Sequence, residues 1–216
     1  MCEIVVYGVP GSPFLRAVLA TLQEKGRPYR LRAMGPGESK SPEYLKLHPF
    51  GRIPAFEHDG FQLYETQAIV RYIDAIFPEP ALQPADAGAA ARMNQAIGIN
   101  DWYLFPEIAR VLVFQRIVGP ALMGLHPDEA AIAAVTPRLP ICIGALDRLI
   151  GDQAFLAGDR LSLADLMLAP QLDYVAATPE GHAALHGTAL PAWLDRMNER
   201  PSMRATLPPE PLREAA

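Results

Sequence analysis

Residues 47–77, LHPFGRIPAFEHDGFQLYETQAIVRYIDAIF, decide the fold of this chain. We expect a strand from Ile53 to Glu57, a turn at Asp59–Gly60 and a second strand from Phe61 to Tyr64, because Asp-Gly between two apolar runs is a strong hairpin signal. A helix then begins at Thr66, a favoured N-cap residue, and its apolar side chains recur on one face. The stretch therefore predicts a β-hairpin followed directly by a helix.

Ile53–Pro54 stands at the start of the first predicted strand. Proline has no N–H and disturbs strand pairing, and the X-Pro bond is the one peptide bond that can be cis at modest cost. A chain that turns outward here would free the N–H and C=O of Ile53. These two groups can then pair with an extended ligand.

The residues before this stretch alternate between strands and helices. Glu3–Tyr7 and Tyr29–Ala33 have strand-like composition, and residues 8–11 form a loop. Helices begin at Ser12–Pro13 and at Ser41–Pro42, because serine is a favoured N-cap and proline is favoured at the first helical position. The resulting order, β-α-β-α-β-β-α, matches a thioredoxin-like domain.

Beyond a proline-rich linker at residues 78–84, only helical patterns remain. We expect a long helix over Ala87–Val118 that Pro106 kinks, and a second over Asp128–Ile150 that two prolines bend or interrupt. The tail Pro208–Pro211 is not expected to be helical.

The composition indicates a soluble protein without nucleic-acid-binding features. Half of the 216 residues are hydrophobic, the formal net charge is −5, and no basic stripe is visible, so nucleic acid is excluded as a partner. Cys2 and Cys142 have neither metal-ligand spacing nor the pattern of a disulfide framework, which suits a reducing compartment. The chain shows no signal-peptide pattern, and no apolar run reaches the roughly 18 residues of a membrane span. We expect a cytoplasmic protein with no membrane partner.

The segments FGRIPAF and ETQAIVRYI resemble the glutathione-binding half of the glutathione S-transferases. YGVPGSPFLRAVLATLQEKG is similar to their serine-type members, phi/theta-like or bacterial. Ser162 and Asp165, at N-cap and N3 spacing, resemble the family's helix-capping motif, whose role is in folding. The resemblance covers Glu3 to about Met203. It implies an α/β thioredoxin-like N-terminal domain at residues 1–78, an all-α C-terminal domain at residues 86–216, and a homodimer.

Ser12 is the candidate catalytic residue. Conjugation needs the glutathione thiolate, and a free thiol with a pKa of about 8.5 is little ionised at neutral pH. A hydroxyl donor and a helix N-terminus both stabilise the anion, and Ser12 offers both at one point. The resemblance implies the same serine. The alternatives are that Ser12 is only an N-cap, or that Tyr7, at the end of the first strand, supplies the hydroxyl as in other classes of the family. Gly11 and Ser12 offer no thiol, so we expect no mixed disulfide with glutathione.

Glutathione would be held at its two ends by different groups. A carboxylate at a helix N-terminus gains from free N–H groups, so Thr66 would bind the γ-glutamyl carboxylate, and Glu65 would receive its amino group. The backbone at Ile53–Pro54 would pair with the middle of the peptide. Lys40 and Arg52 are the candidate cations for the glycine carboxylate, Lys40 because its loop resembles the phi-like loop in which a lysine has this role. The alternative is an N-cap Thr66 beside a solvated Glu65, with both cations solvated.

The second substrate would be a small apolar electrophile. Its pocket would lie between the Ser12 loop and the first long helix, lined by Phe14, Trp102, Tyr103 and Phe114, although aromatic residues at helical spacing are often core residues. His48 is interpreted as a loop histidine, because no Cys, His or carboxylate lies at ligand spacing, and we expect no metal. Cys142 is interpreted as a small buried hydrophobe.

These features predict a glutathione transferase with glutathione as co-substrate and no other cofactor. The thiolate would attack a carbon electrophile, and peroxide reduction or dehalogenation is possible in the same site. The alternatives are a non-catalytic interaction module with the same fold, or a carrier that binds apolar ligands and turns over poorly.

Overall fold

The computed structural model describes residues 3–214, with side chains up to residue 212, so Cys2 lies outside the described residues. Contacts divide the chain into two compact units, residues 1–82 with 200–208, and residues 83–199 with 209–216. The domain boundaries expected from the sequence, 1–78 and 86–216, stay a prediction. In the structure, residues 200–208 pack with the first unit.

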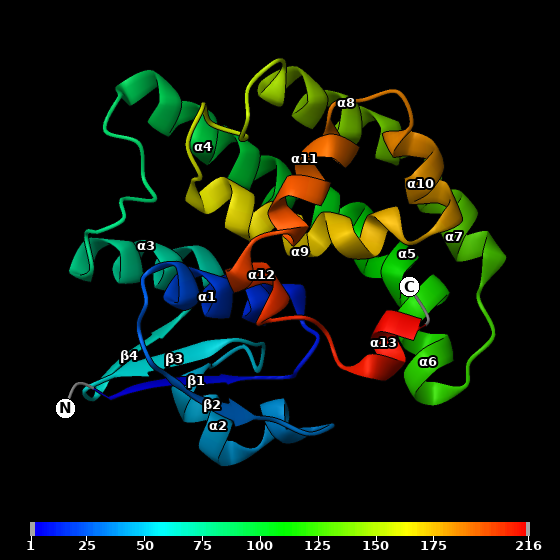
Figure 1. The fold of residues 1–216 in the computed structure, drawn as a ribbon. Coiled ribbons are helices and arrows are strands. Elements are labelled where there is room, and N and C mark those ends of the chain that lie inside the picture. Colours follow the sequence, from blue (N-terminus) through cyan, green and yellow to red (C-terminus); the bar gives the residue numbers. More distant parts are fainter. Residues whose placement is uncertain (1–2, 215–216) are drawn as a thin grey trace. The chain divides into compact units, whose positions relative to one another are not determined.

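The first unit is built on a four-stranded sheet with the order β2-β1-β3-β4. β1 pairs in parallel with β2 and antiparallel with β3, and β3 pairs antiparallel with β4. Helices α1, α3 and α12 lie on one side of this sheet and α2 on the other (Figure 1). The elements are β1 (Ile4–Gly8), α1 (Pro13–Glu24), β2 (Arg30–Ala33), η1 (Glu38–Lys40), α2 (Pro42–Leu47), β3 (Ala55–His58), β4 (Phe61–Tyr64), α3 (Thr66–Ile76) and α12 (Pro201–Arg204).

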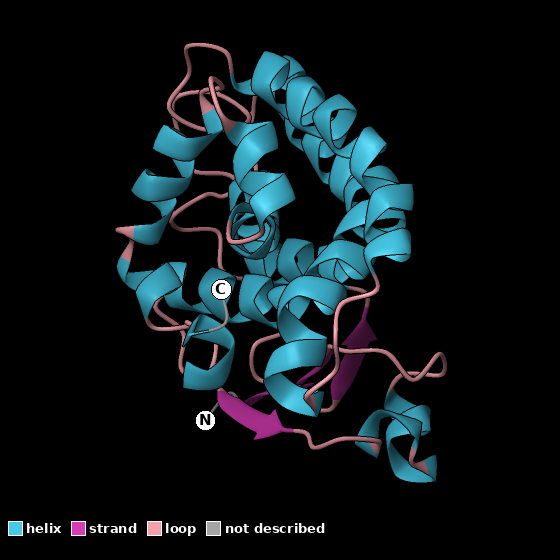
Figure 2. Ribbon diagram, turned by 90° about the vertical axis from the view of Figure 1, so that its right-hand side faces the viewer, coloured by secondary structure: helices cyan, strands magenta, loops and turns pink. Residues whose placement is uncertain are grey.

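The second unit contains only helices among the residues that the structure describes, and Figure 2 shows the strands confined to the sheet. Its elements are α4 (Ala87–Ile99), η2 (Asn100–Ala109), α5 (Arg110–Val113), η3 (Phe114–Val118), α6 (Gly119–Met123), α7 (Glu129–Val135), η4 (Thr136–Arg138), α8 (Leu139–Ile150), α9 (Leu163–Ala176), α10 (Pro179–Leu185), α11 (Leu190–Asn198) and α13 (Glu210–Glu214).

The predicted order β-α-β-α-β-β-α is confirmed, with small shifts at the strand ends. β1 includes Gly8, which was expected in the loop, and β3 begins at Ala55 rather than Ile53. Pro54 has no N–H to give to a strand partner, so regular pairing starts after it. Ser12 and Ser41 are N-caps followed by proline, as predicted.

Two helical expectations need correction. The helix from Ala87 continues to Met123 rather than Val118. Pro106 lies in a stretch of wide π-type turns, η2, and the kink expected there stays a prediction. Such turns accommodate the missing N–H of proline without ending the helix. The tail is also helical from Glu210, because the first turn of a helix tolerates Pro211.

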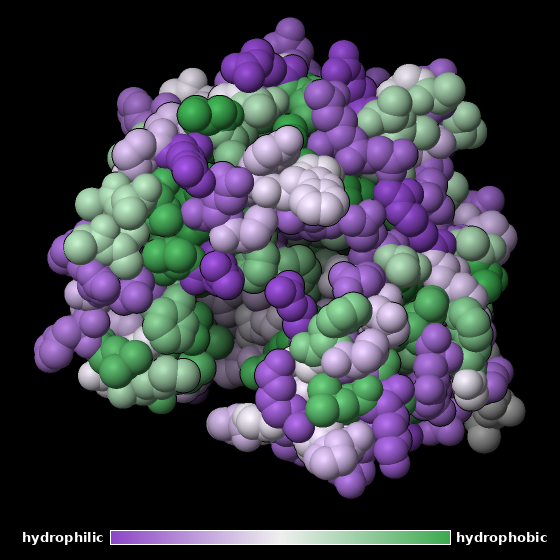
Figure 3. Space-filling view, turned by 180° about the vertical axis from the view of Figure 1, so that it is seen from behind, coloured by the Kyte–Doolittle hydropathy of each residue, from purple (hydrophilic) through white to green (hydrophobic). Residues whose placement is uncertain are grey.

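The helical run Glu129–Ile150 has the length and apolar composition of a membrane span, contrary to the sequence expectation. The prolines that interrupt the pattern do not end the helical path, which continues through η4. One side of α8 is buried in its unit, and core helices of soluble proteins pass the same test, so the indication is weak. On the face shown in Figure 3, hydrophobic and hydrophilic side chains are interspersed, without a continuous apolar belt.

The capping box of α9 is confirmed and is part of a larger buried network. The fully buried Asp165 carboxylate accepts hydrogen bonds from the backbone N–H and hydroxyl of Ser162, at 2.8 and 2.7 Å. Its other oxygen accepts from the Leu156 N–H and the Trp193 indole N–H, both at 2.9 Å. Burial raises the pKa of Asp165, and these four donors oppose that rise. One side chain thus ties together the loop before α9, the start of α9, and α11.

The last part of the first unit is held to α1 by a half-buried ion pair. Both oxygens of Glu24 accept from the Arg200 guanidinium, at 2.8 Å each, and one also accepts from the Ser202 hydroxyl. Burial would raise the pKa of Glu24, but the hydrogen bonds from Arg200 and Ser202 and the charge of Arg200 outweigh it and lower the pKa. The ionised form of Glu24 is therefore favoured in the folded state.

The lowered pKa predicts a pH-dependent contribution to stability. The contribution is present above the unfolded-state pKa of about 4.3 and is lost as the pH falls through the lower folded-state value. Glu24→Gln should lower the free energy of unfolding by about 1–2 kcal/mol at pH 7, and the difference from wild type should shrink below about pH 4. Urea unfolding at several pH values measures this. Glu3→Gln, which breaks the exposed pair with Arg30, is the matched control and should change stability by less than about 1 kcal/mol. Equal effects of the two variants at pH 7 would contradict the assignment.

Candidate functional site

The strand register brings the predicted site segments to one end of the sheet. Tyr7 of β1 lies opposite Ala55 of β3, which lies opposite Tyr64 of β4, and Gly8 lies beside Ala33 at the end of β2. Each of these residues is next to a predicted site segment. The loop to Ser12 follows β1, the loop to Lys40 follows β2, Pro54 precedes β3, and Glu65–Thr66 follows β4. Four segments that are distant in sequence therefore converge at one end of the sheet.

The hydroxyl oxygen of Ser12 accepts a capping hydrogen bond, and the hydroxyl hydrogen remains available. Its oxygen accepts from the Leu15 N–H at 3.4 Å, a long and weak capping bond, and its side chain is only partly buried. Among the described residues, no acceptor is bonded to the hydroxyl hydrogen. The N-cap interpretation and the thiolate-donor interpretation are therefore compatible, since the first uses a lone pair and the second uses the hydrogen.

Tyr7 has a different environment. It packs against the cluster of Met34, Tyr44 and Ala55. Burial and the charge of Glu57 raise its pKa, despite the opposing effects of Arg30 and Arg32. A phenol whose pKa is raised is a weaker donor to an anion, so this environment favours the core interpretation of Tyr7.

Pro54 follows a cis peptide bond, and the loop around it is fixed by Tyr44. The Tyr44 hydroxyl donates to the carbonyl of Arg52 at 2.7 Å and lies within reach of the Ala55 backbone N–H, so it holds both flanks of Ile53–Pro54. Burial raises the pKa of Tyr44 to about 12. Among the described residues, the N–H and C=O of Ile53 have no hydrogen-bond partner, which leaves them available as the sequence predicted. The role of Tyr44 was missed, since a tyrosine on the apolar side of a short helix has no distinguishing pattern.

The junction between β4 and α3 corrects one expectation. Thr66 is not the N-cap of α3 but its first helical residue, 7% exposed. Glu65 takes the N-cap position because its φ of 70° is not helical, and its exposed carboxylate makes no capping bond. A non-glycine residue at this φ is strained by roughly 1–3 kcal/mol, and such strain concentrates at functional sites. The backbone N–H and hydroxyl of Thr66 have no partner among the described residues.

The two candidate cations flank a tight glycine turn. Lys40 donates to the carbonyl of Phe50 at 3.3 Å. Gly51, at φ 57°, is packed so closely that a β-carbon there would come within 2.7 Å of the Ser39 carbonyl and 2.8 Å of the Lys40 ammonium. Only glycine therefore fits at position 51, beside Lys40 and directly before Arg52. The charges of Lys40, Arg52 and Glu65 all act on the imidazole of His48, so these three residues share one neighbourhood.

The four aromatic residues predicted for the electrophile pocket are not core residues. Trp102 is 73% exposed and Tyr103 is 56% exposed, both in η2, and the side chains of Phe14 and Phe114 are partly buried. The pocket itself stays a prediction. Cys142 is buried, as predicted, and burial raises the pKa of its thiol. No cluster of metal-ligating side chains occurs within residues 3–212.

Comparisons with known proteins agree with these features. The family described as "Glutathione S-transferase, N-terminal domain" matches residues 6–81, and "Glutathione S-transferase, C-terminal domain" matches residues 129–197. Glutathione S-transferase 3 of Zea mays is 32% identical and covers 98% of this chain, which in turn covers 98% of that protein. The crystal structure of glutathione transferase F7 from Populus trichocarpa has a TM-score of 0.83 and 29% identity, over 94% of this chain and 97% of that one. A glutathione S-transferase-I solved with lactoylglutathione has a TM-score of 0.82 and 26% identity, over 94% and 98%.

The strain at Glu65 predicts that two substitutions of this residue will differ in stability. Glycine adopts positive φ without the β-carbon clash, whereas alanine keeps the strain. Glu65→Gly should therefore be about 1 kcal/mol more stable than Glu65→Ala, while both lose the carboxylate and bind glutathione more weakly than wild type. Thermal unfolding and calorimetric titration measure the two effects. The opposite order of stability would show that the backbone at Glu65 is not strained, and unchanged affinity would remove Glu65 from the site.

Proposed function

The chain belongs to the glutathione S-transferase family, and on this premise we propose that Ser12 activates the glutathione thiol for attack on a small apolar electrophile. The relatives reported above are named transferases, so the chain is a glutathione transferase with glutathione as its co-substrate. The observation that carries the proposal is the convergence of Ser12, Pro54 and Glu65–Thr66 at one end of the sheet. The comparisons give no support to the non-catalytic alternative.

The proposed binding mode assigns each part of glutathione to a different segment. The free N–H and C=O of Ile53 pair with the backbone of the tripeptide at cis-Pro54. The N–H and hydroxyl of Thr66, at the N-terminus of α3, bind the γ-glutamyl carboxylate, and the Glu65 carboxylate receives the amino group. Lys40 and Arg52 neutralise the glycine carboxylate. The thiol is thereby placed toward the loop between β1 and α1.

The chemistry then depends on ionisation of the thiol. The hydroxyl hydrogen of Ser12 donates to the sulfur, and the positive end of the α1 helix dipole adds a favourable field. Lowering the thiol pKa from about 8.5 by about two units corresponds to roughly 2.7 kcal/mol of stabilisation of the thiolate. The thiolate attacks a carbon electrophile and forms a C–S bond. In a substitution the leaving group departs with the electron pair of its bond to carbon; in an addition to an activated double bond the π bond breaks and the resulting carbanion takes up a proton from solvent. Phe14, Trp102, Tyr103 and Phe114 are proposed to contact the electrophile.

The proposed partner and location follow the family pattern. We propose a homodimer in the cytoplasm. Large exposed apolar side chains support association, because Phe50 is 65% exposed in the first unit and Trp102 is exposed in the second.

The first experiment tests the role of Ser12 in ionisation. Glutathione binding is measured by calorimetry, and thiolate absorbance is followed against pH in the same samples. Wild type should bind glutathione with a thiol pKa below 8.5, and Ser12→Ala should raise the bound pKa by about 1–2 units, since a hydrogen bond to a charged group is worth about 1.5–3 kcal/mol. Because the thiolate fraction falls accordingly, conjugation at pH 7 should fall by roughly 3- to 25-fold. Ser12→Thr, which keeps the hydroxyl, and Tyr7→Phe should each keep the ionisation curve near that of wild type. An unchanged curve in Ser12→Ala would leave Ser12 as a cap only.

The dimer is tested by mass. Light scattering at micromolar protein should give about 47 kDa, twice the 23.6 kDa of the chain. A single species at 23.6 kDa would refute the homodimer without affecting the assignment of Ser12.

A further inference from the structure

His48 is a buried histidine among the residues proposed to bind glutathione, and the proposed mechanism does not use it. It follows α2 and is only 2% exposed. Its ring lies among three aromatic rings, with centroids 4.8 Å from Tyr64, 6.2 Å from Phe50 and 6.3 Å from Tyr44. Its Nδ1 is buried and has no hydrogen-bond partner in the part of the chain that the structure describes.

The backbone around His48 forms the turn that connects the two cations. The carbonyl of His48 accepts from the Gly51 N–H at 2.8 Å, which closes residues 48–51 into a tight turn. Two further carbonyls in this segment accept from side chains: that of Phe50 from Lys40, and that of Arg52 from Tyr44. The ring of His48 thus joins this turn to Tyr64, the residue before Glu65.

Three charged side chains act on the ring, and aromatic side chains contact it. Glu65 at the β4–α3 junction favours the protonated imidazole, and Arg52 and Lys40 oppose it. Tyr44 and Tyr64 contribute ring faces. Burial is the largest effect and lowers the pKa of His48. The imidazole is neutral at pH 7. A second ring proton would create a buried positive charge near two cations, on a ring whose Nδ1 has no hydrogen-bond partner in the described structure.

We propose that His48 is a positioning residue for glutathione: its neutral imidazole holds the turn of residues 48–52 against the end of β4, so that Lys40 and Arg52 keep their spacing from Glu65, and protonation releases the turn. The inference rests on the proposed function for its ligand. An open turn lets the imidazole reach the ordinary histidine pKa of about 6.5, whereas the closed turn keeps it lower. The closed turn is therefore fully favoured above about pH 6.5 and becomes less favoured as the pH falls below it. Glutathione should bind more weakly there.

The experiment uses S-methylglutathione, because this thioether has no ionisable thiol and its binding does not report on Ser12. Calorimetry measures its Kd between pH 5.5 and 7.5, a range above the ordinary carboxyl pKa values of about 4. The wild-type Kd should increase by a factor of about three to ten from pH 7.5 to 5.5, and about tenfold is the upper limit for one group of pKa about 6.5. Titrations in two buffers of different ionisation enthalpy should show proton release on binding at pH 5.5.

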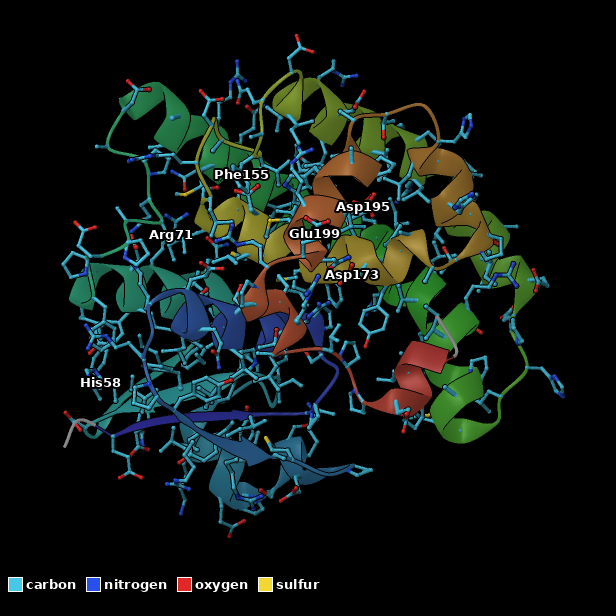
Figure 4. The ribbon with its side chains drawn as sticks, in the orientation of Figure 1. His58, Arg71, Phe155, Asp173, Asp195 and Glu199 are labelled. Atoms are coloured by element: carbon cyan, nitrogen blue, oxygen red, sulfur yellow. The ribbon has the colours of Figure 1, made fainter. Side chains whose placement is uncertain are left out.

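Two variants distinguish the effect of the titratable proton on His48 from the effect of its aromatic ring. His48→Phe keeps an aromatic ring without a titratable group, so its Kd should be independent of pH and its binding should release no proton. His58→Gln is the matched control: His58 pairs with Tyr72 at 2.8 Å and lies at the opposite end of the sheet, where β3 turns into β4 (Figure 4). This variant should keep the wild-type pH dependence. An identical pH dependence in His48→Phe and wild type would overturn the proposal.

A measurement on the wild type keeps the test independent of folding of the variants. Hydrogen–deuterium exchange of the peptide that spans residues 48–52, corrected for intrinsic rates, should show less protection at pH 5.5 than at pH 7.5 without ligand. Equal protection at both pH values would also overturn the proposal. Absence of S-methylglutathione binding at pH 7.5 would instead contradict the proposed function, while the exchange result would still decide whether the proton on His48 opens the turn.

Discussion

The pairing of Tyr7 with Ala55 and of Ala55 with Tyr64 is the constraint on which the site depends. Successive side chains of a strand point to opposite faces of the sheet. A slip of the pairing by one residue would therefore move each buried side chain of β3 to the other face. Phe56 is 1% exposed and Val6 is fully buried in the same core, which fixes the register energetically. Ser12, Pro54 and Glu65 each lie within a few residues of the paired positions. The core of the sheet therefore sets the spacing of the site.

Local conformations that a relaxed chain avoids gather at this end of the sheet. Glu65 has a positive φ, and Gly51 has a positive φ with no room for a β-carbon. These features coexist with groups that have no hydrogen-bond partner in the described part of the chain, namely the N–H and C=O of Ile53 and the buried Nδ1 of His48. By contrast, Asp165 in the helical unit is as buried as any group in the chain and has four donors on its two oxygens. The first arrangement leaves hydrogen-bonding capacity for a ligand, and the second uses it for the fold.

Sequence reasoning was most successful where one residue has one strong local preference. Ser-Pro before α1 and α2, the Asp-Gly turn, and the Ser162–Asp165 capping box were all predictable, because caps and turns depend on the nearest few residues. Thr66 was misassigned as an N-cap because nothing in the sequence shows that Glu65 adopts a positive φ. The register is set by tertiary packing, which also imposes that φ.

Three other features were missed for a common reason. They are the burial of His48, the hydrogen bond from Tyr44 to the Arg52 carbonyl, and the packing of residues 200–208 with the first unit. Each depends on contacts that a local pattern does not encode, from the bond of Tyr44 to Arg52, 8 residues along the chain, to the packing of residues 200–208 with the first unit. The wide turns around Pro106 were also missed, since proline in a helical pattern predicts a break or kink and does not distinguish a kink from a π-type stretch.

The packing of α12 on α1 has a consequence for how the chain folds during synthesis. Arg16, almost fully buried in α1, donates to the carbonyl of Met203 at 3.2 Å, and Glu24 holds Arg200. The sheet and the helices up to residue 82 thus leave the ribosome with part of the surface of α1 uncovered. At roughly 5–20 residues per second, the missing segment follows after on the order of ten seconds. During that interval the nascent first unit lacks the Met203 carbonyl that accepts from Arg16, and the part of α1 on which α12 packs stays uncovered.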